Sequence, residues 1–264
     1  MSHSHPGTAL ITGASSGIGA IYAERLARRG YGLILVARNR GRLNALAKRL
    51  SDETGRSIEV EVADLADKAD LARVEALLRS DASIRVLVNN AGIGATRPLL
   101  ESNVDKLEDL LTLNVNVLTR LTYAAVPGFV ARGGGTLINI ASIVAIAPEV
   151  LNGVYGGSKA FVLAFSQSLR HELADKNVRV QVVLPGATAT DFWGLAGTPL
   201  EYLPDAIVMK ADDMVDAALA GLDQGEFVTI PALPEIADLN DYETARQKLL
   251  PNLSRSVPAA RYQG

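Results

Sequence analysis

Three side chains in the second half of this sequence have the types and spacing for proton transfer to or from a substrate oxygen. Tyr155 and Lys159 are four residues apart, so on a helix they lie on the same face. A nearby ammonium favours the phenolate and lowers the pKa of a tyrosine from its usual value of about 10. Ser142 ends the strand-like run 135–142 and can donate to the same oxygen. The spacing predicts an acid–base site, although most Tyr-x-x-x-Lys pairs are only an aromatic ring beside a solvated amine.

A glycine-rich loop near the N-terminus gives the acid–base prediction a context. Residues 12–19 read TGASSGIG, after an apolar strand-like run and before a helical pattern. A loop in this setting is typical of dinucleotide binding. Gly13 permits the tight turn, while Gly17 and Gly19 let the backbone approach a pyrophosphate that the free helix amides face. A flexible surface loop is the alternative. The residues expected at the cofactor are Gly13, Ser15, Ser16, Gly17, Ile18 and Gly19.

These motifs together resemble those of the short-chain dehydrogenase/reductase family over about residues 8 to 230. The glycine pattern Thr-Gly-x-x-x-Gly-x-Gly is similar to that of the short, non-extended branch. Further signatures follow in order: Asn89-Asn90-Ala91-Gly92, then Asn114, then Tyr155-Gly-Gly-Ser-Lys159, then Pro185-Gly186. The resemblance implies an α/β, three-layer, doubly wound Rossmann fold with a seven-stranded parallel sheet, and an NAD(P)-dependent oxidoreductase.

The resemblance also implies roles for individual residues. Tyr155 would be the general acid in carbonyl reduction and the general base in alcohol oxidation, with Ser142 orienting the substrate oxygen. Lys159 would also hold the nicotinamide ribose. Asn114 would anchor a water that links Lys159 to solvent, which is compatible with a helix-interior Asn bonded to backbone. The other matched cofactor positions are Asp64 and Leu65 at the adenine, Asn90, Ala91 and Gly92 at the ribose, and Pro185, Gly186, Thr188 and Thr190 at the nicotinamide amide and phosphates. Asn89 is interpreted as a strand-end residue that satisfies backbone groups, and Asp191 as a loop residue.

Alternating apolar runs and helical patterns predict the elements that position these residues. Strands are expected near 8–12, 32–37, 57–62, 85–89, 135–140, 178–184 and 226–230, and helices near 17–29, 40–54, 67–79, 103–131, 153–176 and 211–223. This alternation is typical of a parallel sheet covered on both faces. Ligands of such a sheet bind beyond the carboxyl ends of its strands. The candidates Gly13, Arg38, Asp64, Asn90, Ser142 and Pro185 all fall there.

Arg38 is predicted to select the cofactor. Sites that prefer NAD place an acid near the end of the second strand, where it binds the adenosine ribose. Here Ala37 stands at that place and Arg38 follows. A guanidinium binds a 2′-phosphate through charge-assisted hydrogen bonds, whereas a carboxylate repels it. The sequence therefore predicts NADP(H) in preference to NAD(H), with a solvated charge opening the next helix as the alternative.

Composition excludes several functions. A chain of 264 residues is long enough for one large α/β domain, and its net charge of −3 gives no indication of nucleic acid or an anionic membrane as partner. The absence of cysteine excludes disulfides and a thiol nucleophile. No apolar stretch reaches spanning length and residues 1–6 lack a signal-peptide core, so a cytoplasmic protein is expected. His3 and His5 are interpreted as part of a flexible N-terminus, 1–7, and no metal site is expected.

One domain is expected over 1–264, with a substrate loop at 188–208 and a C-terminal extension at 231–264. By position, the walls of the substrate pocket are predicted to be Gly94, Val144, Ile146, Val150, Leu151, Phe192 and Trp193. This mostly apolar set favours a medium-sized hydrophobic ketone, aldehyde or secondary alcohol. Trp193 packing under the loop is an equal alternative. In the extension, Tyr242, Ala245, Leu249 and Leu250 share a helical stripe that covers the cleft, supports a subunit contact or caps the sheet.

Gly156 and Gly157 lie inside a predicted helix, where each costs about 1 kcal/mol relative to alanine. We expect the bare surface to admit substrate, cofactor or a facing helix, with drift as the alternative. By the resemblance, a homodimer or homotetramer is expected, with the helices that carry Asn114 and Tyr155 packed across a two-fold axis. A cofactor-sensing protein on the same scaffold and an interaction protein acting through its tail stay open. A methyltransferase of similar fold would leave the Tyr–Lys pair and Arg38 unexplained.

Overall fold

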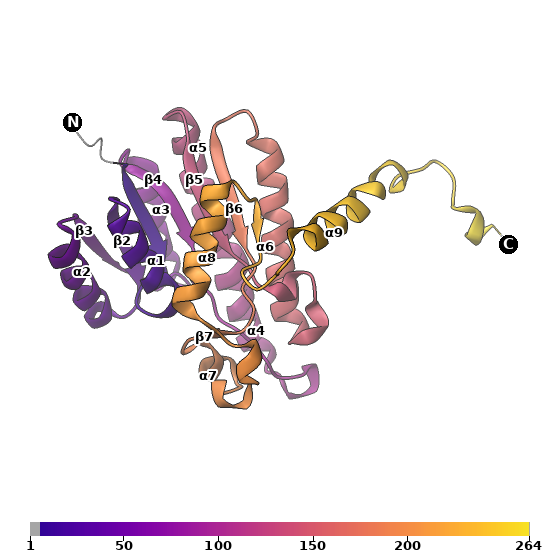
Figure 1. The fold of residues 1–264 in the computed structure, drawn as a ribbon, viewed down its shortest axis with the longest axis horizontal. Helices are drawn as coiled ribbons and strands as arrows, with labels where there is room; N and C mark the ends of the chain where they lie inside the picture. The colour runs from indigo at the N-terminus through magenta and orange to yellow at the C-terminus, as the bar shows by residue number, and fades with distance from the viewer. Residues whose placement is uncertain (1–5, 264) are drawn as a thin grey trace. The chain divides into compact units, whose positions relative to one another are not determined.

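A computed structural model of the chain describes residues 6–263, which fall into two compact units, divided between Pro231 and Ala232. The first unit is built on a parallel sheet of seven strands in the described chain, in the order β3-β2-β1-β4-β5-β6-β9 (Figure 1). Its strands are β1 (Thr8–Thr12), β2 (Gly32–Ala37), β3 (Ile58–Val62), β4 (Ile84–Asn89), β5 (Gly135–Ile140), β6 (Val178–Val183) and β9 (Val228–Thr229). The predicted doubly wound α/β fold is confirmed.

Helices cover both faces of this sheet because its strands are apolar on both faces. Ile11 and Leu35 belong to a core with α1 (Gly17–Arg28), α2 (Arg40–Thr54) and α8 (Ala211–Gln224). Leu10 and Ile34, one residue earlier on each strand, face α3 (Lys68–Ser80) and α5 (Leu118–Ala131), and α6 (Gly153–Glu172) extends this second core. The predicted helices of this unit are all present, with ends that differ from the expected ones by a few residues.

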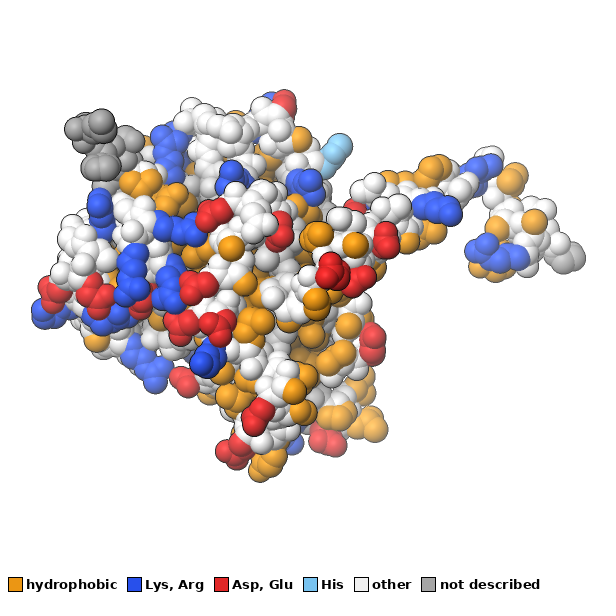
Figure 2. Space-filling model, in the orientation of Figure 1, with side chains coloured by type: hydrophobic (Ala, Val, Ile, Leu, Met, Phe, Trp, Pro, Cys, Tyr) orange, Lys and Arg blue, Asp and Glu red, His pale blue; other side chains and the backbone are white. Residues whose placement is uncertain are grey.

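Strand order reverses beside β1, because β2 and β3 lie on one side of it and β4 to β6 on the other. The carboxyl ends of β1 and β4 therefore form the switch point at which a doubly wound sheet binds its ligand. Outside the sheet, Arg25 of α1 pairs with Asp212 and Asp216 of α8, and Arg29 pairs with Asp223. Figure 2 shows basic and acidic side chains interleaved over this region. These pairs join the two helices along their length.

Several elements differ from the prediction. The helix expected over 103–131 is divided into α4 (Val104–Leu111), a π-helical turn at Thr112–Val117, and α5. Residues 188–208, predicted as a substrate loop, contain β7 (Thr188–Ala189), which pairs in parallel with β8 (Met209–Lys210), and the short helix α7 (Phe192–Ala196). Neither β7 nor β8 lies in an apolar run long enough to predict a strand, so the sequence pattern did not reveal them.

The second unit consists of α9 (Ile236–Lys248) and two 3-10 turns, Leu250–Asn252 and Ala260–Tyr262. Tyr242 and Ala245 of the predicted stripe lie in α9, where Glu243 pairs with Arg246. The expectation of one domain stays a prediction. Residues 1–5, with His3 and His5, lie outside the described residues. Within 6–263, no helix is long and apolar enough to cross a membrane.

Candidate active site

The glycine loop is fastened to the segment after β4 by Thr12. Its hydroxyl accepts hydrogen bonds from the amides of Asn90 and Ala91, at 3.0 Å each, and donates to the Val88 carbonyl at 3.2 Å. The Asn90 side chain returns a bond of 2.9 Å to the Thr12 carbonyl. Thr12 was not among the predicted site residues, because a hydroxyl at a strand end is a weak signal until its partner strand is known.

Close packing explains the glycines of this loop. Gly13 has φ 67°, and a Cβ there would lie 2.8 Å from the Asn90 side-chain nitrogen and 3.0 Å from the Ala91 Cα. A Cβ on Gly19 would overlap the Gly13 carbonyl oxygen. Gly17, with φ 52°, begins α1, and Thr190 approaches it from the substrate loop. The loop therefore keeps its backbone bare toward the switch point.

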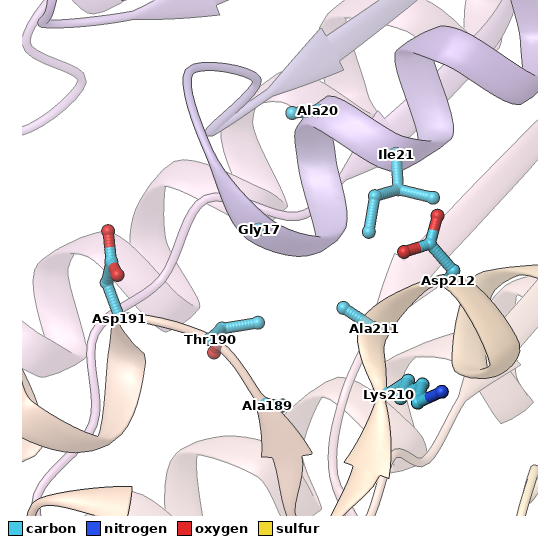
Figure 3. A pocket seen from close by; sticks show the side chains of 9 residues that line it. All are labelled: Gly17, Ala20, Ile21, Ala189, Thr190, Asp191, Lys210, Ala211 and Asp212. Atoms are coloured by element: carbon cyan, nitrogen blue, oxygen red, sulfur yellow. The ribbon is translucent and has the colours of Figure 1, made fainter.

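A cavity of ≈ 470 Å³ opens at the N-terminus of α1 (Figure 3). One wall comes from α1, and the other from the segment around β7 and from β8 and α8; the lining residues are Gly17, Ala20, Ile21, Ala189, Thr190, Asp191, Lys210, Ala211 and Asp212. The Ser16 side chain at the N-cap of α1 makes no capping hydrogen bond within the described chain, and the first turn of α1 contains no acidic residue. Free amides and a bare loop beside a cavity fit the pyrophosphate of a dinucleotide. Sequence analysis did not identify Lys210 or Asp212 here.

Arg38 follows β2 directly and leaves 75% of its side chain exposed. Its guanidinium lies 3.9 Å from the Asp64 carboxylate, an exposed pair that contributes little to stability. Leu65, next to Asp64, is buried in the core. Asp191, interpreted as a loop residue, lies 3.5 Å from Arg42 and lines the cavity. Arg38 is thus open to solvent at the place where a 2′-phosphate is expected.

Tyr155, Ser142 and Lys159 come together at the carboxyl end of β5. Tyr155 lies in the first turn of α6, which Asn152 begins by accepting from the amides of Val154 and Tyr155. The Ser142 hydroxyl adjoins the Tyr155 phenol and favours a lower pKa for it. Lys159 lies one turn later, with its ammonium 5.8 Å from the centre of the Tyr155 ring, and donates to the Ile140 carbonyl at 3.0 Å. Asn152 was not predicted, although an Asn before a helical run is a capping signal.

Burial dominates the ionisation of these groups. It raises the pKa of Tyr155, which is 5% exposed, to about 12, and the Ser142 hydroxyl opposes that rise. It also lowers the pKa of Lys159, which is 7% exposed, to about 8. The pKa of Tyr155 thus lies above its usual value, not below it as the sequence indicated, because the apolar surroundings disfavour the phenolate by more than the Ser142 hydroxyl favours it.

Asn114 lies in the π-helical turn and, like Thr12, binds the segment after β4 through hydrogen bonds. Its side chain accepts from the Ile93 amide and donates to the Ile93 carbonyl, both at 2.9 Å. It also donates to the Ser158 hydroxyl at 3.3 Å, which in turn donates to the Tyr155 carbonyl. A Cβ on Gly92 would lie 3.0 Å from the Asn114 oxygen and 3.6 Å from the Lys159 ammonium. Asn114 and Lys159 therefore both lie beside Gly92, and π-helical turns are frequent at functional sites.

The predicted pocket residues lie in different environments in the structure. Val144, Leu151 and Phe192 belong to one apolar cluster with Tyr155. Ile146 packs instead against the core between α6 and β6, and Val150 is 58% exposed. Trp193 is buried under the loop, where its ring nitrogen donates to the Thr188 carbonyl at 3.0 Å. Gly94 faces the Phe192 ring.

The remaining predicted positions surround the same edge of the sheet. The Pro185 carbonyl accepts from the Ile143 amide and the Ser142 hydroxyl, and the Gly186 carbonyl accepts from Thr188. The interpretation of Asn89 is corrected, because its side chain donates to Thr122 at 3.1 Å and to Asn139 at 3.0 Å, and both of these are side-chain contacts. Buried polar groups of this kind need partners, so Asn89 joins a network across β4, β5 and α5.

Comparison with known proteins decides the family. The sequence matches the family model described as short chain dehydrogenase over residues 7–198. The chain belongs to this family. It is thus an oxidoreductase of the short-chain dehydrogenase/reductase type, as its motifs predicted.

Solved structures of two family members are similar over almost the whole chain. A short-chain dehydrogenase from Sphingobium yanoikuyae in complex with NADPH is 50% identical, with a TM-score of 0.94, and the match covers 97% of this chain and 99% of that one. The bulky-bulky ketone specific alcohol dehydrogenase from Comamonas testosteroni is 44% identical, with a TM-score of 0.90 and coverage of 99% and 100%. Among sequences, 17-beta-hydroxysteroid dehydrogenase type 3 of Danio rerio is 32% identical over 228 residues, 83% of this chain and 70% of that protein.

Proposed function

We propose that this short-chain dehydrogenase is an NADP(H)-dependent reductase of ketones with two bulky apolar substituents, and that it also oxidises the corresponding secondary alcohols. The observation that carries the proposal is the Tyr155–Ser142 hydroxyl pair set in an apolar cluster, with Lys159 beneath it. The similarity to a bulky-bulky ketone specific alcohol dehydrogenase supports the substrate class. Exposed Arg38 and the similarity to a protein in complex with NADPH support the cofactor.

The chain's own residues bind and orient both reactants. The glycine loop 13–19, Asn90 and the segment 185–190 would hold the dinucleotide, with Arg38 at the 2′-phosphate. When bound, NADPH supplies the two electrons and the hydrogen that reduce the carbonyl carbon. The hydroxyls of Ser142 and Tyr155 bind the carbonyl oxygen, and Tyr155 donates the proton to it. In the reverse direction Tyr155 accepts that proton.

Lys159 and Asn114 support this proton transfer. The ammonium of Lys159 stabilises the tyrosinate that remains after the proton leaves, because it lies on the same helix face. Asn114 holds the backbone of Ile93 in place and lies, like Lys159, beside Gly92. We assign Asn114 the role of anchoring a water that links Lys159 to solvent.

The proposal is tested by following NADPH oxidation in the presence of aryl alkyl ketones. The wild type should reduce them, and Tyr155→Phe should lower kcat by about 10²- to 10⁴-fold because it removes the transferable proton. NADPH affinity should stay near the wild-type value, since the glycine loop and Arg38 are unchanged. A Tyr155→Phe enzyme with substantial turnover would contradict the acid–base assignment, and a wild type that binds NADPH without reducing any carbonyl would favour a sensor.

We also propose that the chain assembles as a homodimer or homotetramer through α5 and α6. Their outer faces carry a stacked aromatic trio. Phe165 lies 6.3 Å from Tyr123 and 5.7 Å from Phe161, measured between ring centroids. Tyr123 is 69% exposed in the single chain, and an exposed aromatic group of this size is typical of a protein interface.

A further inference from the structure

The Phe192 ring lies directly beside Tyr155. It is the first residue of α7, and its ring centroid is 5.8 Å from that of Tyr155, with the two planes at 47°. On its other side, the Trp193 ring meets it edge-on at 5.7 Å and 87°. Phe192 is only half-buried, whereas Tyr155 and Trp193 are buried. Phe192 is therefore an aromatic neighbour of Tyr155 that is itself partly exposed to solvent.

Gly94 forms the seat of this ring. A Cβ at Gly94 would overlap the tip of the Phe192 ring and would lie 2.7 and 2.9 Å from two further ring atoms. Real contacts to a Cβ are longer than this, so the ring can occupy its position only because residue 94 has no side chain. Gly94 thus has a steric function, which the sequence alone indicated only by its position near the pocket.

Hydrogen bonds hold the helix of Phe192 against the segment that contains its seat. The Ala196 carbonyl accepts from the amide of Thr96 at 3.2 Å and from its hydroxyl at 3.0 Å. The bond from the Trp193 ring nitrogen to the Thr188 carbonyl fixes the other end of α7. Both ends of this short helix are therefore held, and an altered position of the Phe192 ring is expected to come from its side-chain torsions.

We propose that Phe192 determines which ketones the enzyme accepts: its ring, seated on Gly94, fills the space beside Tyr155 that the second bulky substituent of a ketone needs, and turns away to admit it. The inference rests on the proposed function and deepens it. A methyl ketone needs little of this space, whereas a ketone with two large groups must displace the ring. The cost of that displacement then enters kcat/KM for large substrates only.

The test compares a methyl ketone with a ketone carrying two large groups. Phe192→Ala should raise the ratio of kcat/KM for the large ketone to that for the small one by about tenfold or more. Phe192→Leu should give an intermediate ratio, which guards against misfolding of the alanine variant. Leu195→Ala is the matched control, because Leu195 lies on the same helix, is 86% exposed and should leave both values unchanged. An unchanged ratio in both Phe192 variants overturns the inference.

Gly94→Ala tests the seat independently. It should raise the same ratio in the wild type, because the added methyl excludes the ring, and should have no such effect in Phe192→Ala, where no ring remains. If Gly94→Ala changed the ratio equally in the wild type and in Phe192→Ala, Gly94 would act without Phe192. That result would contradict the role of Gly94 as the contact surface for the Phe192 ring.

The only tryptophan of the chain, Trp193, reports the position of the ring without turnover. Adding a bulky aliphatic ketone to the enzyme with NADP⁺ should change Trp193 emission in the wild type and not in Phe192→Ala. A wild type that reduces no ketone contradicts the proposed function. The wild type could reduce ketones while the ratio of kcat/KM values does not change in the Phe192 variants and Trp193 emission does not respond to the ketone. That result would contradict only the role of Phe192. An equal emission response in the wild type and in Phe192→Ala would also contradict only that role.

Discussion

Lys159 places an ammonium in the interior, and that placement costs stability. Burial lowers its pKa from 10.5 to about 8, so at neutral pH the charged form is held in surroundings that disfavour it. Its hydrogen bond to the Ile140 carbonyl offsets part of this cost. The residue is thus placed for chemistry at the expense of stability, as is common in active sites.

Lys159→Met should therefore be inactive and more stable than the wild type at pH 7, by on the order of 2 kcal/mol. Below pH 8 both the folded and unfolded wild type are protonated, and the folded protein carries the full cost. Between about pH 8 and 10.5 the unfolded chain keeps a proton that the folded protein releases, so wild-type stability rises with pH and the difference shrinks. Urea unfolding at pH 7 and near pH 10 measures both effects. A variant less stable than the wild type at pH 7 would show that the bond to Ile140 outweighs the burial cost.

Arg38 should act on the 2′-phosphate alone. Arg38→Ala should weaken NADPH binding by about 10- to 100-fold, because it removes a charge-assisted contact, and leave NADH binding unchanged. Fluorescence titrations with both cofactors measure this. Lys48→Ala is the control for net charge, because it also removes one positive charge, that of the exposed ion pair between Lys48 and Asp52. Equal losses for the two cofactors would remove Arg38 as the selector.

Residue spacing along the chain predicted which catalytic side chains meet at the site. It did not predict the environment of those side chains where segments distant in sequence form it. Tyr155 and Lys159 share a helix, so their proximity follows from four-residue spacing. The pKa of Tyr155 depends on Leu110, Val144 and Phe192, which reach it from three other segments. No local pattern carries that information, which is why the direction of its pKa shift was predicted wrongly.

At the scale of elements, long apolar runs predicted the central sheet well, because a buried parallel strand is apolar throughout. β7, β8 and α7 escaped prediction because, unlike the equally short β9, they do not lie in an apolar run, and the pairing of β7 with β8 joins residues about twenty positions apart. The π-helical turn was missed because its residues also fit an α-helix. These are the elements nearest to the proposed substrate, so the site is predicted less completely than its scaffold.

The two glycines of α6 behave differently within this element. Gly157 is exposed, and a Cβ there meets no described atom within 4 Å, whereas a Cβ on Gly156 would lie 3.0 Å from the Pro148 Cβ. Gly156 thus admits Pro148 of the segment before α6, which is not among the substrate, cofactor or facing helix that the sequence predicted.

Gly157→Ala should stabilise the protein by about 0.5–1 kcal/mol through the helix propensity of alanine, and Gly156→Ala should destabilise it. Thermal unfolding of the two variants provides matched measurements on one helix. A loss of stability in Gly157→Ala would mean that a second chain covers this face in solution.

For the whole molecule, the apolar faces of α5 and α6 give the proposed assembly its test. Introducing charge at two members of the aromatic trio, Tyr123→Glu with Phe161→Glu, should convert the oligomer to single chains, because unpaired carboxylates would be buried at the interface. Scattering or sedimentation gives the mass, and NADPH titration verifies that the fold persists. Tyr202→Glu, at an equally exposed tyrosine outside these helices, is the control and should keep the wild-type mass. A wild type with the mass of one chain would contradict the assembly, and an unchanged mass in the double variant would place the interface elsewhere.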